Sequence, residues 1–235
     1  MTADDVMKAL EKLGTESTRK TYLRHGCRAP LFGVKIGDMK VLMKKTGRDT
    51  RLAKELYKTG NYDAQYFAAL IGNGAELTRA ELQQWAKKAC WTGVSEFSVP
   101  WMASEHPEAW DIGLGWIDSD QESIQSSGWS TLSGVVSTRP DEQLDLDGVK
   151  KLLARVSNEI HEAPDRVKYT MNGFVIAVGA SVKPLAKQAA ATAKTIGTVR
   201  IDMGDTDCKV PLASEYIEKA IARSGPGHKR KTIKC

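Results

Sequence analysis

Tryptophan and acidic residues gather in the middle of this chain. The 235 residues include six tryptophans, which are Trp85, Trp91, Trp101, Trp110, Trp116 and Trp129. Residues 61–147 also carry 14 aspartates and glutamates against 4 lysines and arginines, and Glu96 follows Trp91 by five positions. Aromatic rings beside carboxylates attract flat cations through cation–π and stacking contacts. Packing in a hydrophobic core explains the same tryptophans equally well, so both interpretations stay open.

Basic residues dominate the two ends of the chain. Residues 1–60 hold 14 lysines and arginines against 7 acidic residues, and residues 148–235 hold 16 against 8. Two stripes recur at helical spacing, Lys40, Lys44, Arg48 and Arg51 in the first region and Lys183, Lys187 and Lys194 in the last. Each stripe is either an ordinary solvated helix face or a set of phosphate contacts, which would make binding to a polyanion depend on salt.

Other classes of site lack their sequence signatures. The chain contains no GxSxG, Walker, HExxH or dinucleotide-binding motif. Its four cysteines are scattered and its four histidines are isolated from one another, so we expect reduced thiols, no metal and no cofactor. No apolar run approaches the ~20 residues that cross a bilayer, and no secretory signal opens the sequence. We therefore expect a cytoplasmic monomer.

Helical patterns run from one end of the chain to the other and must position these residues. Thr78 followed by Glu81 is a capping box, and Gly14 and Gly60 end earlier helices. The patterns predict helices near 2–13, 16–24, from 36, 50–58, 62–71, from 78, 91–104, 107–117, 121–138, 147–161, 165–179, 182–196 and 211–223, with a loop at 197–210.

About thirteen short helices predict an all-α fold. The short connections favour an α-solenoid of antiparallel helix pairs over a globular bundle, although no repeat near 40 residues is visible. We expect one helical domain over residues 1–224. Residues 225–235, which begin GPGHKR, are expected to form a basic, flexible tail unless they dock.

Five segments, in their order along the chain, resemble the DNA alkylation repair family, the AlkD-like proteins built from HEAT-like repeats. The segments are LFGVKIGDMKVLMKK at 31–45, LAKELYKTGNYDAQYFAALI at 52–71, VPWMASEHPE at 99–108, GWSTLSGVV at 128–136 and YTMNGFVIAVG at 169–179. The resemblance implies a C-shaped α-solenoid whose concave basic surface holds double-stranded DNA. It also implies release of cationic N3- or N7-alkylated purines, because active members of the family are DNA glycosylases.

The resemblance implies a site in which a Trp-x-x-x-Asp helix supplies a carboxylate that stabilises the oxocarbenium-like sugar. Trp91 matches the tryptophan, but Ser95 occupies the aspartate position. Glu96 is the candidate catalytic carboxylate instead. One residue turns a helix by ~100°, so Glu96 in a regular helix points away from the usual direction.

Two further positions depart from the family pattern. In the helix that carries Trp129, Leu132 stands where active members have an arginine, and Phe174 replaces a later tryptophan. Leucine cannot bind a phosphate. With Trp91 and Ser95, these three residues are expected to line the lesion cleft.

These observations support three functions. The first is a DNA-binding protein that holds damaged or distorted duplex DNA, with weak or no glycosylase activity. The second is an active glycosylase that uses Glu96. The third is a protein-binding helical scaffold, which the acidic middle of the chain favours because carboxylates repel phosphate.

Overall fold

The computed structural model describes residues 1–234, and its regular elements in that range are all helices. Contacts divide the chain into two compact units. Unit 1 comprises Met1–Pro107, Met203–Asp207 and the end of the chain from Lys234. Unit 2 comprises Glu108–Asp202 and Cys208–Ile233. The single helical domain that the sequence predicts over residues 1–224 stays a prediction.

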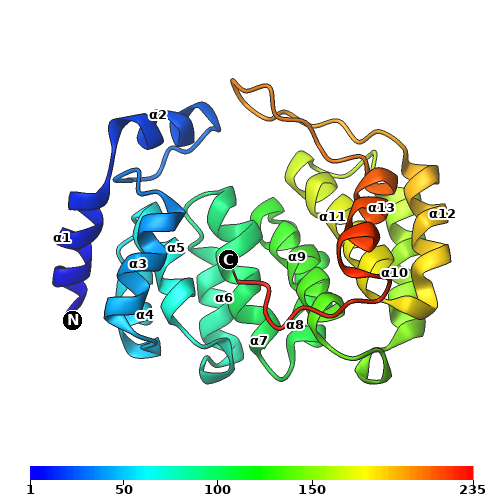
Figure 1. The fold of residues 1–235 in the computed structure, drawn as a ribbon, viewed down its shortest axis with the longest axis horizontal. Helices are drawn as coiled ribbons and strands as arrows, with labels where there is room; N and C mark the ends of the chain where they lie inside the picture. Colours follow the sequence, from blue (N-terminus) through cyan, green and yellow to red (C-terminus); the bar gives the residue numbers. More distant parts are fainter. Residues whose placement is uncertain (235) are drawn as a thin grey trace. The chain divides into compact units, whose positions relative to one another are not determined.

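Unit 1 contains the first seven α-helices and a π-helical turn. They are α1 (Ala3–Leu13), α2 (Glu16–Arg24), α3 (Ile36–Thr46), α4 (Thr50–Tyr57), α5 (Tyr62–Ile71), η1 (Gly74–Glu76), α6 (Arg79–Lys87), the π turn η2 (Val94–Ser98) and α7 (Val99–Glu105) (Figure 1). Helix α5 is the centre of this unit, because all ten of its residues are buried and α1, α3, α4, α7 and η2 pack around it.

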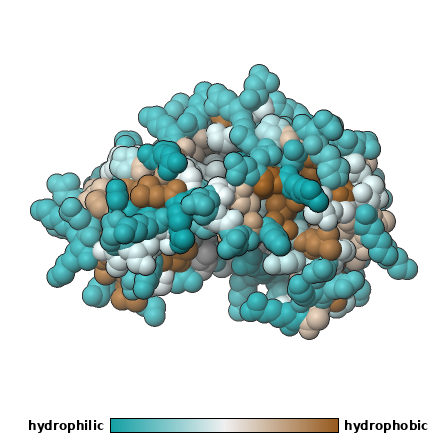
Figure 2. Space-filling view, turned by 90° about the horizontal axis from the view of Figure 1, so that it is seen from above, coloured by the Kyte–Doolittle hydropathy of each residue, from teal (hydrophilic) through white to brown (hydrophobic). Residues whose placement is uncertain are grey.

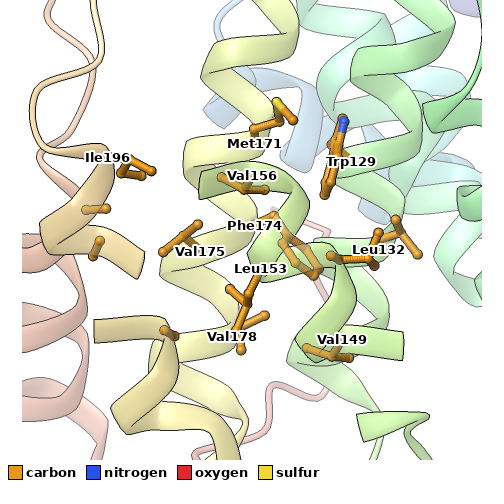
Figure 3. Packing of buried hydrophobic residues seen from close by; sticks show 14 of the residues in the cluster. Trp129, Leu132, Val149, Leu153, Val156, Met171, Phe174, Val175, Val178 and Ile196 are labelled. Atoms are coloured by element: carbon orange, nitrogen blue, oxygen red, sulfur yellow. The ribbon is translucent and has the colours of Figure 1, made fainter. Parts of the chain in front are cut away.

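Unit 2 contains the last six α-helices. They are α8 (Ala109–Ile117), α9 (Glu122–Thr138), η3 (Asp141–Gln143), α10 (Leu146–Glu159), α11 (Asp165–Ser181), η4 (Lys183–Leu185), α12 (Ala186–Ile196) and α13 (Ala213–Ser224). Helix α11 packs against α9, α12 and α13, as Figure 1 shows. Its buried face contributes to a hydrophobic cluster that draws on α9, α10 and α12 as well (Figure 3).

Local sequence signals explain several helix starts. Thr2 and Thr78 form capping boxes with Asp5 and Glu81, the residues three positions later. Asp145 caps α10 by accepting a hydrogen bond from the backbone of Gly148. The predicted ranges 16–24, 62–71 and 121–138 therefore coincide with α2, α5 and α9 to within one residue.

Two predicted helices are interrupted in the structure. The pattern over 91–104 is broken by the π turn before α7, and the one over 182–196 begins as a 3-10 turn before α12. Pro100 and Pro184 lie at these junctions and lack the backbone N–H that a continuous α-helix needs. The segment 197–210 contains no helix or strand, as predicted.

The C-terminal segment, which the sequence predicted to be flexible unless it docks, makes defined contacts. In unit 2, the Gly227 N–H donates to the Ala180 carbonyl at 2.9 Å, and the Arg230 N–H donates to Ser137 at 2.8 Å. In unit 1, the Lys234 ammonium donates to the Gly72 carbonyl at 2.7 Å and pairs with Glu105 at 2.8 Å. Docking on these groups fixes the segment.

Two further searches covered residues 1–234. No helix in that range is long and apolar enough to cross a membrane. Nor does that range bring three or more His, Cys, Asp or Glu side chains together in a group able to hold a metal ion.

Candidate nucleic-acid interface

Trp91 belongs to an aromatic cluster in unit 1. Its ring lies edge-on to Tyr62, with ring centroids 4.9 Å apart, and tilted against Tyr22 at 5.8 Å. Tyr22 and Tyr62 contact each other at 5.0 Å, and Tyr66 extends the cluster from the Tyr62 side. Trp91 itself is only half-buried. The cluster therefore holds one indole ring in place while leaving part of it open to solvent.

Ser95 and Glu96 lie in the π turn that follows Trp91. Both side chains are buried, at 2% and 4% exposure, whereas Phe97 beside them is 43% exposed. The Val99 N–H bonds the carbonyl of Val94, five residues earlier, so this turn is wider than an α-helical one. A wider turn rotates less per residue. The angle between Ser95 and Glu96 around the turn is consequently smaller than the ~100° of a regular α-helix.

The structure places Trp129, Leu132 and Phe174 in the hydrophobic core of unit 2, which corrects their predicted place in a lesion cleft. All three side chains are 0% exposed, and the Trp129 and Phe174 rings meet edge to face at 5.4 Å. Figure 3 shows them among Val149, Leu153 and their neighbours. Side chains enclosed in this way are not accessible to DNA, because they fill the space between α9, α10 and α11.

A guanidinium group does approach Trp129, from a predicted helix whose arginine was not among the candidate residues. Arg155 on α10 lies over the Trp129 ring, 5.9 Å from its centroid. Burial works to lower the pKa of Arg155, but hydrogen bonds to Glu159 and Asp118 outweigh it and raise the pKa. The arginine is thus held by two carboxylates, at 2.8 Å and 2.6 Å. In the sequence, Arg155 is one of several charged residues on an amphipathic helix, so nothing there indicated a contact with Trp129.

The first basic stripe does not lie along one helix, contrary to the prediction. Gly47 has φ +75° and ends α3, and Asp49 then caps α4. Lys40 and Lys44 therefore share a face of α3, whereas Arg48 lies in the connection and Arg51 in α4. Lys40 is half-buried and the other three are exposed. Within residues 1–234 none of the four forms an ion pair.

The second stripe matches its prediction more closely. Lys187 and Lys194 lie seven positions apart on α12, which is two helical turns, and Lys183 belongs to the preceding η4 turn. All three are exposed and without an ion pair in the described part of the chain. The opposite face of α12 is buried through Ala189 and Ile196. Figure 2 shows hydrophilic residues over most of the viewed surface, with hydrophobic ones in separate patches.

Asp63 was not among the predicted site residues, yet it organises the surroundings of Trp91. Its carboxylate, 0% exposed on α5, accepts the backbone N–H groups of Phe32, Gly33 and Val34 at 2.6, 3.0 and 2.9 Å. Burial raises the pKa of Asp63, and these hydrogen bonds oppose that rise. The signal was an acidic residue in the otherwise apolar helix YDAQYFAALI. This carboxylate fixes the loop between α2 and α3.

The model of the family described as "DNA alkylation repair enzyme" matches residues 6–201 of this sequence. The chain belongs to the DNA alkylation repair family. Membership confirms the resemblance carried by the five segments. Two relatives are similar to this chain, the uncharacterized proteins Lin0241 of Listeria innocua and Lmo0209 of Listeria monocytogenes. They are 32% and 31% identical, over 94% and 95% of this chain and 97% and 99% of their own lengths.

A solved structure gives the comparison of folds. It is described as "a new family of proteins related to the HEAT-like repeat DNA glycosylases with affinity for branched DNA structures". The match covers 100% of both chains at 36% sequence identity, with a TM-score of 0.91. The all-helical, HEAT-like repeat fold predicted from the sequence is therefore confirmed for this member of the alkylation repair family.

Proposed function

We propose that this chain binds branched or otherwise distorted DNA, with weak or no glycosylase activity. The observation that carries the proposal is the full-length match to a protein with affinity for branched DNA structures, at 36% identity. At that identity the two chains share a fold. The remaining question is whether this chain carries the groups that DNA binding requires.

Unpaired cations on the surface support DNA binding. Lys44, Arg51, Lys187 and Lys194 are exposed and form no ion pair within residues 1–234. A lysine or arginine with no carboxylate partner can neutralise a phosphate without first breaking an ion pair. Binding of this kind releases counterions, so its affinity falls as the salt concentration rises.

The residue identities argue against efficient base excision. The family resemblance implies an aspartate at the position of Ser95 and an arginine at that of Leu132. A serine hydroxyl supplies no negative charge to a developing sugar cation. Leu132 is enclosed in the core of unit 2 and offers neither charge nor access.

An active glycosylase that uses Glu96 is the second candidate, and the π turn favours it. Glu96 lies within this turn, which rotates less per residue than an α-helix and so reduces the angle between Glu96 and the usual aspartate position. Glu96 is 4% exposed, which is the kind of dry environment that strengthens electrostatic stabilisation of a cation.

The test of DNA binding compares a four-way junction, a fork and a linear duplex of equal length. We expect tightest binding to the junction, by fluorescence anisotropy, with affinity that falls between about 50 and 200 mM salt. Lys187→Glu with Lys194→Glu should weaken binding and reduce the salt slope by about 2. Equal, salt-insensitive binding to all three DNAs, or none, would reject the proposal and favour the protein-scaffold alternative.

The test of excision measures release of 7-methylguanine and 3-methyladenine from methylated duplex DNA. We expect release at the uncatalysed rate from the wild type. If release exceeds background, Glu96→Gln should abolish it while Glu55→Gln, at an exposed position of α4, should not. That pattern would establish the second candidate and overturn the claim of weak or absent activity.

A further inference from the structure

Helix α2 is the one α-helix of residues 1–234 that contributes no buried residue. Its sequence, ESTRKTYLR, offers little apolar surface, and burial of hydrophobic side chains therefore does not explain its place in the fold. A short helix without core contacts is marginal in stability. It persists here because other groups anchor it.

One aromatic side chain supplies most of that anchor. Tyr22 packs against Tyr62 and Trp91, and its hydroxyl donates to the Val34 carbonyl at 3.2 Å. At the start of α2, the Thr15 N–H donates to the Gly33 carbonyl at 3.0 Å. These contacts connect α2 to the loop that Asp63 holds, and they set its inner side against the half-buried Trp91.

The outer side of α2 is basic and only partly neutralised. Arg19 lies 3.6 Å from Glu16, and the Arg28 guanidinium donates to the Leu23 and Cys27 carbonyls. Lys20 and Arg24 have no such partner in the described chain, and both are exposed. Four positions separate them, so the two charges lie on one face of the helix and repel each other.

These two residues line a surface hollow of about 520 Å³. Ser17, Thr21 and Leu23 complete its described lining, so two cations stand beside hydroxyl groups that can donate hydrogen bonds. An arginine in the last turn also interacts favourably with the helix dipole, which accounts for Arg24 alone. It does not account for Lys20. Two acidic residues are close in the structure, because Glu16 stands four residues before Lys20 and the Asp205 N–H donates to the Arg24 carbonyl at 3.1 Å. Glu16 pairs with Arg19 instead.

We propose that α2 binds the phosphodiester backbone of a nucleic-acid strand through Lys20 and Arg24. This inference rests on the proposed function and deepens it, because it names the helix that holds the strand. Two exposed cations one helical turn apart favour a strand over a free phosphate ion, because they can contact neighbouring phosphates along it. Tyr22 lies about 200° around the helix from either cation, so the aromatic cluster holds α2 from its other side.

The chain offers a matched pair of variants for the test. Lys20→Glu with Arg24→Glu changes two charges four residues apart on α2. Lys8→Glu with Lys12→Glu makes the same change, at the same spacing, on exposed positions of α1. We expect the α2 variant to bind the four-way junction at least about tenfold more weakly, with a salt slope smaller by about 2, and the α1 variant to behave like the wild type.

Different outcomes distinguish the possible failures. If the wild type binds no DNA, the proposed function fails before this inference is reached. If the wild type binds and the α2 variant retains its affinity and salt slope, only the inference about α2 is wrong. Competition by inorganic phosphate beyond its effect on ionic strength would also overturn it, because the site would then accept a free ion.

Two checks exclude a trivial loss of structure. Lys20→Ala with Arg24→Ala removes the charges without adding new ones, and its thermal unfolding should match the wild type because α2 buries no residue. The same alanine variant should bind the junction more weakly than the wild type, and wild-type affinity would contradict the proposal.

Discussion

Asp63 shows how one buried carboxylate can determine the geometry of a neighbouring surface. Its two oxygens accept hydrogen bonds from three consecutive backbone N–H groups. A neutral side chain of this size cannot accept three such bonds. Gly33 is required within this loop, because its φ is +81° and an added Cβ would lie 2.6 Å from the backbone nitrogen of Arg19. The loop therefore tolerates little change in either partner.

Asp63→Asn tests this role. Asparagine keeps the shape but replaces one acceptor oxygen with a donor, so at least one buried N–H loses its partner. We expect the free energy of unfolding to fall by roughly 2–4 kcal/mol. Chemical denaturation measures the change, and Asp4→Asn on exposed α1 should cost less than about 1 kcal/mol. An Asp63→Asn protein as stable as the wild type would show that these hydrogen bonds contribute little.

The aromatic and charged residues of the site illustrate what sequence can and cannot predict at this scale. The sequence identified Trp91 as a candidate, and the structure leaves it half-buried beside Tyr22 and Tyr62. It equally suggested Trp129, which is fully enclosed. Trp129 follows Gly128 within α9, whereas Trp91 lies between α6 and the π turn. Burial depends on which distant helices pack against each one.

At the scale of the helices, glycines determine how closely neighbours approach. Helices α8 and α9 meet at Gly128, where an added Cβ would lie 2.7 Å from the backbone nitrogen of Ile117. A backbone atom cannot move aside as a flexible side chain can. By contrast, Gly115 on α8 is exposed and has no neighbour within 4 Å of an added Cβ.

These two glycines give opposite predictions for the same substitution. Gly128→Ala should lower the free energy of unfolding by about 1–3 kcal/mol, because it forces α8 and α9 apart. Gly115→Ala should raise it by about 0.5–1 kcal/mol, because alanine loses less backbone freedom in a helix. The urea midpoints of the two variants measure both effects at once. A shift in the same direction for both would contradict the proposed close approach.

Helix boundaries were more predictable than helix interiors. Capping residues such as Thr78 act on the adjacent turn, so sequence alone located α6 and its start. The π turn before α7 was missed because it depends on how Val94 and its neighbours pack against α5. The end of α3 was missed because the charge spacing through Arg48 continued a helical pattern past Gly47.

At the scale of the molecule, the last residues of the chain complete the first unit. The Lys234 ammonium is buried and bonds the Gly72 carbonyl and the Glu105 carboxylate. Burial lowers the pKa of Lys234, and the nearby Glu105 opposes that shift. Glu105 also accepts the N–H of Gly74, so the lysine closes a network at the end of α5.

Lys234→Met tests this network while keeping a long apolar side chain. The Gly72 carbonyl would lose a charged partner, and we expect unfolding to be easier by about 1–3 kcal/mol. Thermal unfolding measures the loss, and hydrogen exchange at the Gly74 amide should quicken at the same time. Lys231→Met, on the same segment, should change neither quantity. An unchanged rate of hydrogen exchange at Gly74 in the Lys234 variant would contradict this explanation.

The same lysine has a consequence for how the protein is made. Lys234 is separated by 162 residues from Gly72 and by 129 from Glu105. During translation, α5 and α7 leave the ribosome long before the residue that joins them does. Unit 1 must therefore wait, with a buried carbonyl and part of a carboxylate unpaired, until Lys234 has left the ribosome. Its final stability is acquired only when this lysine has docked.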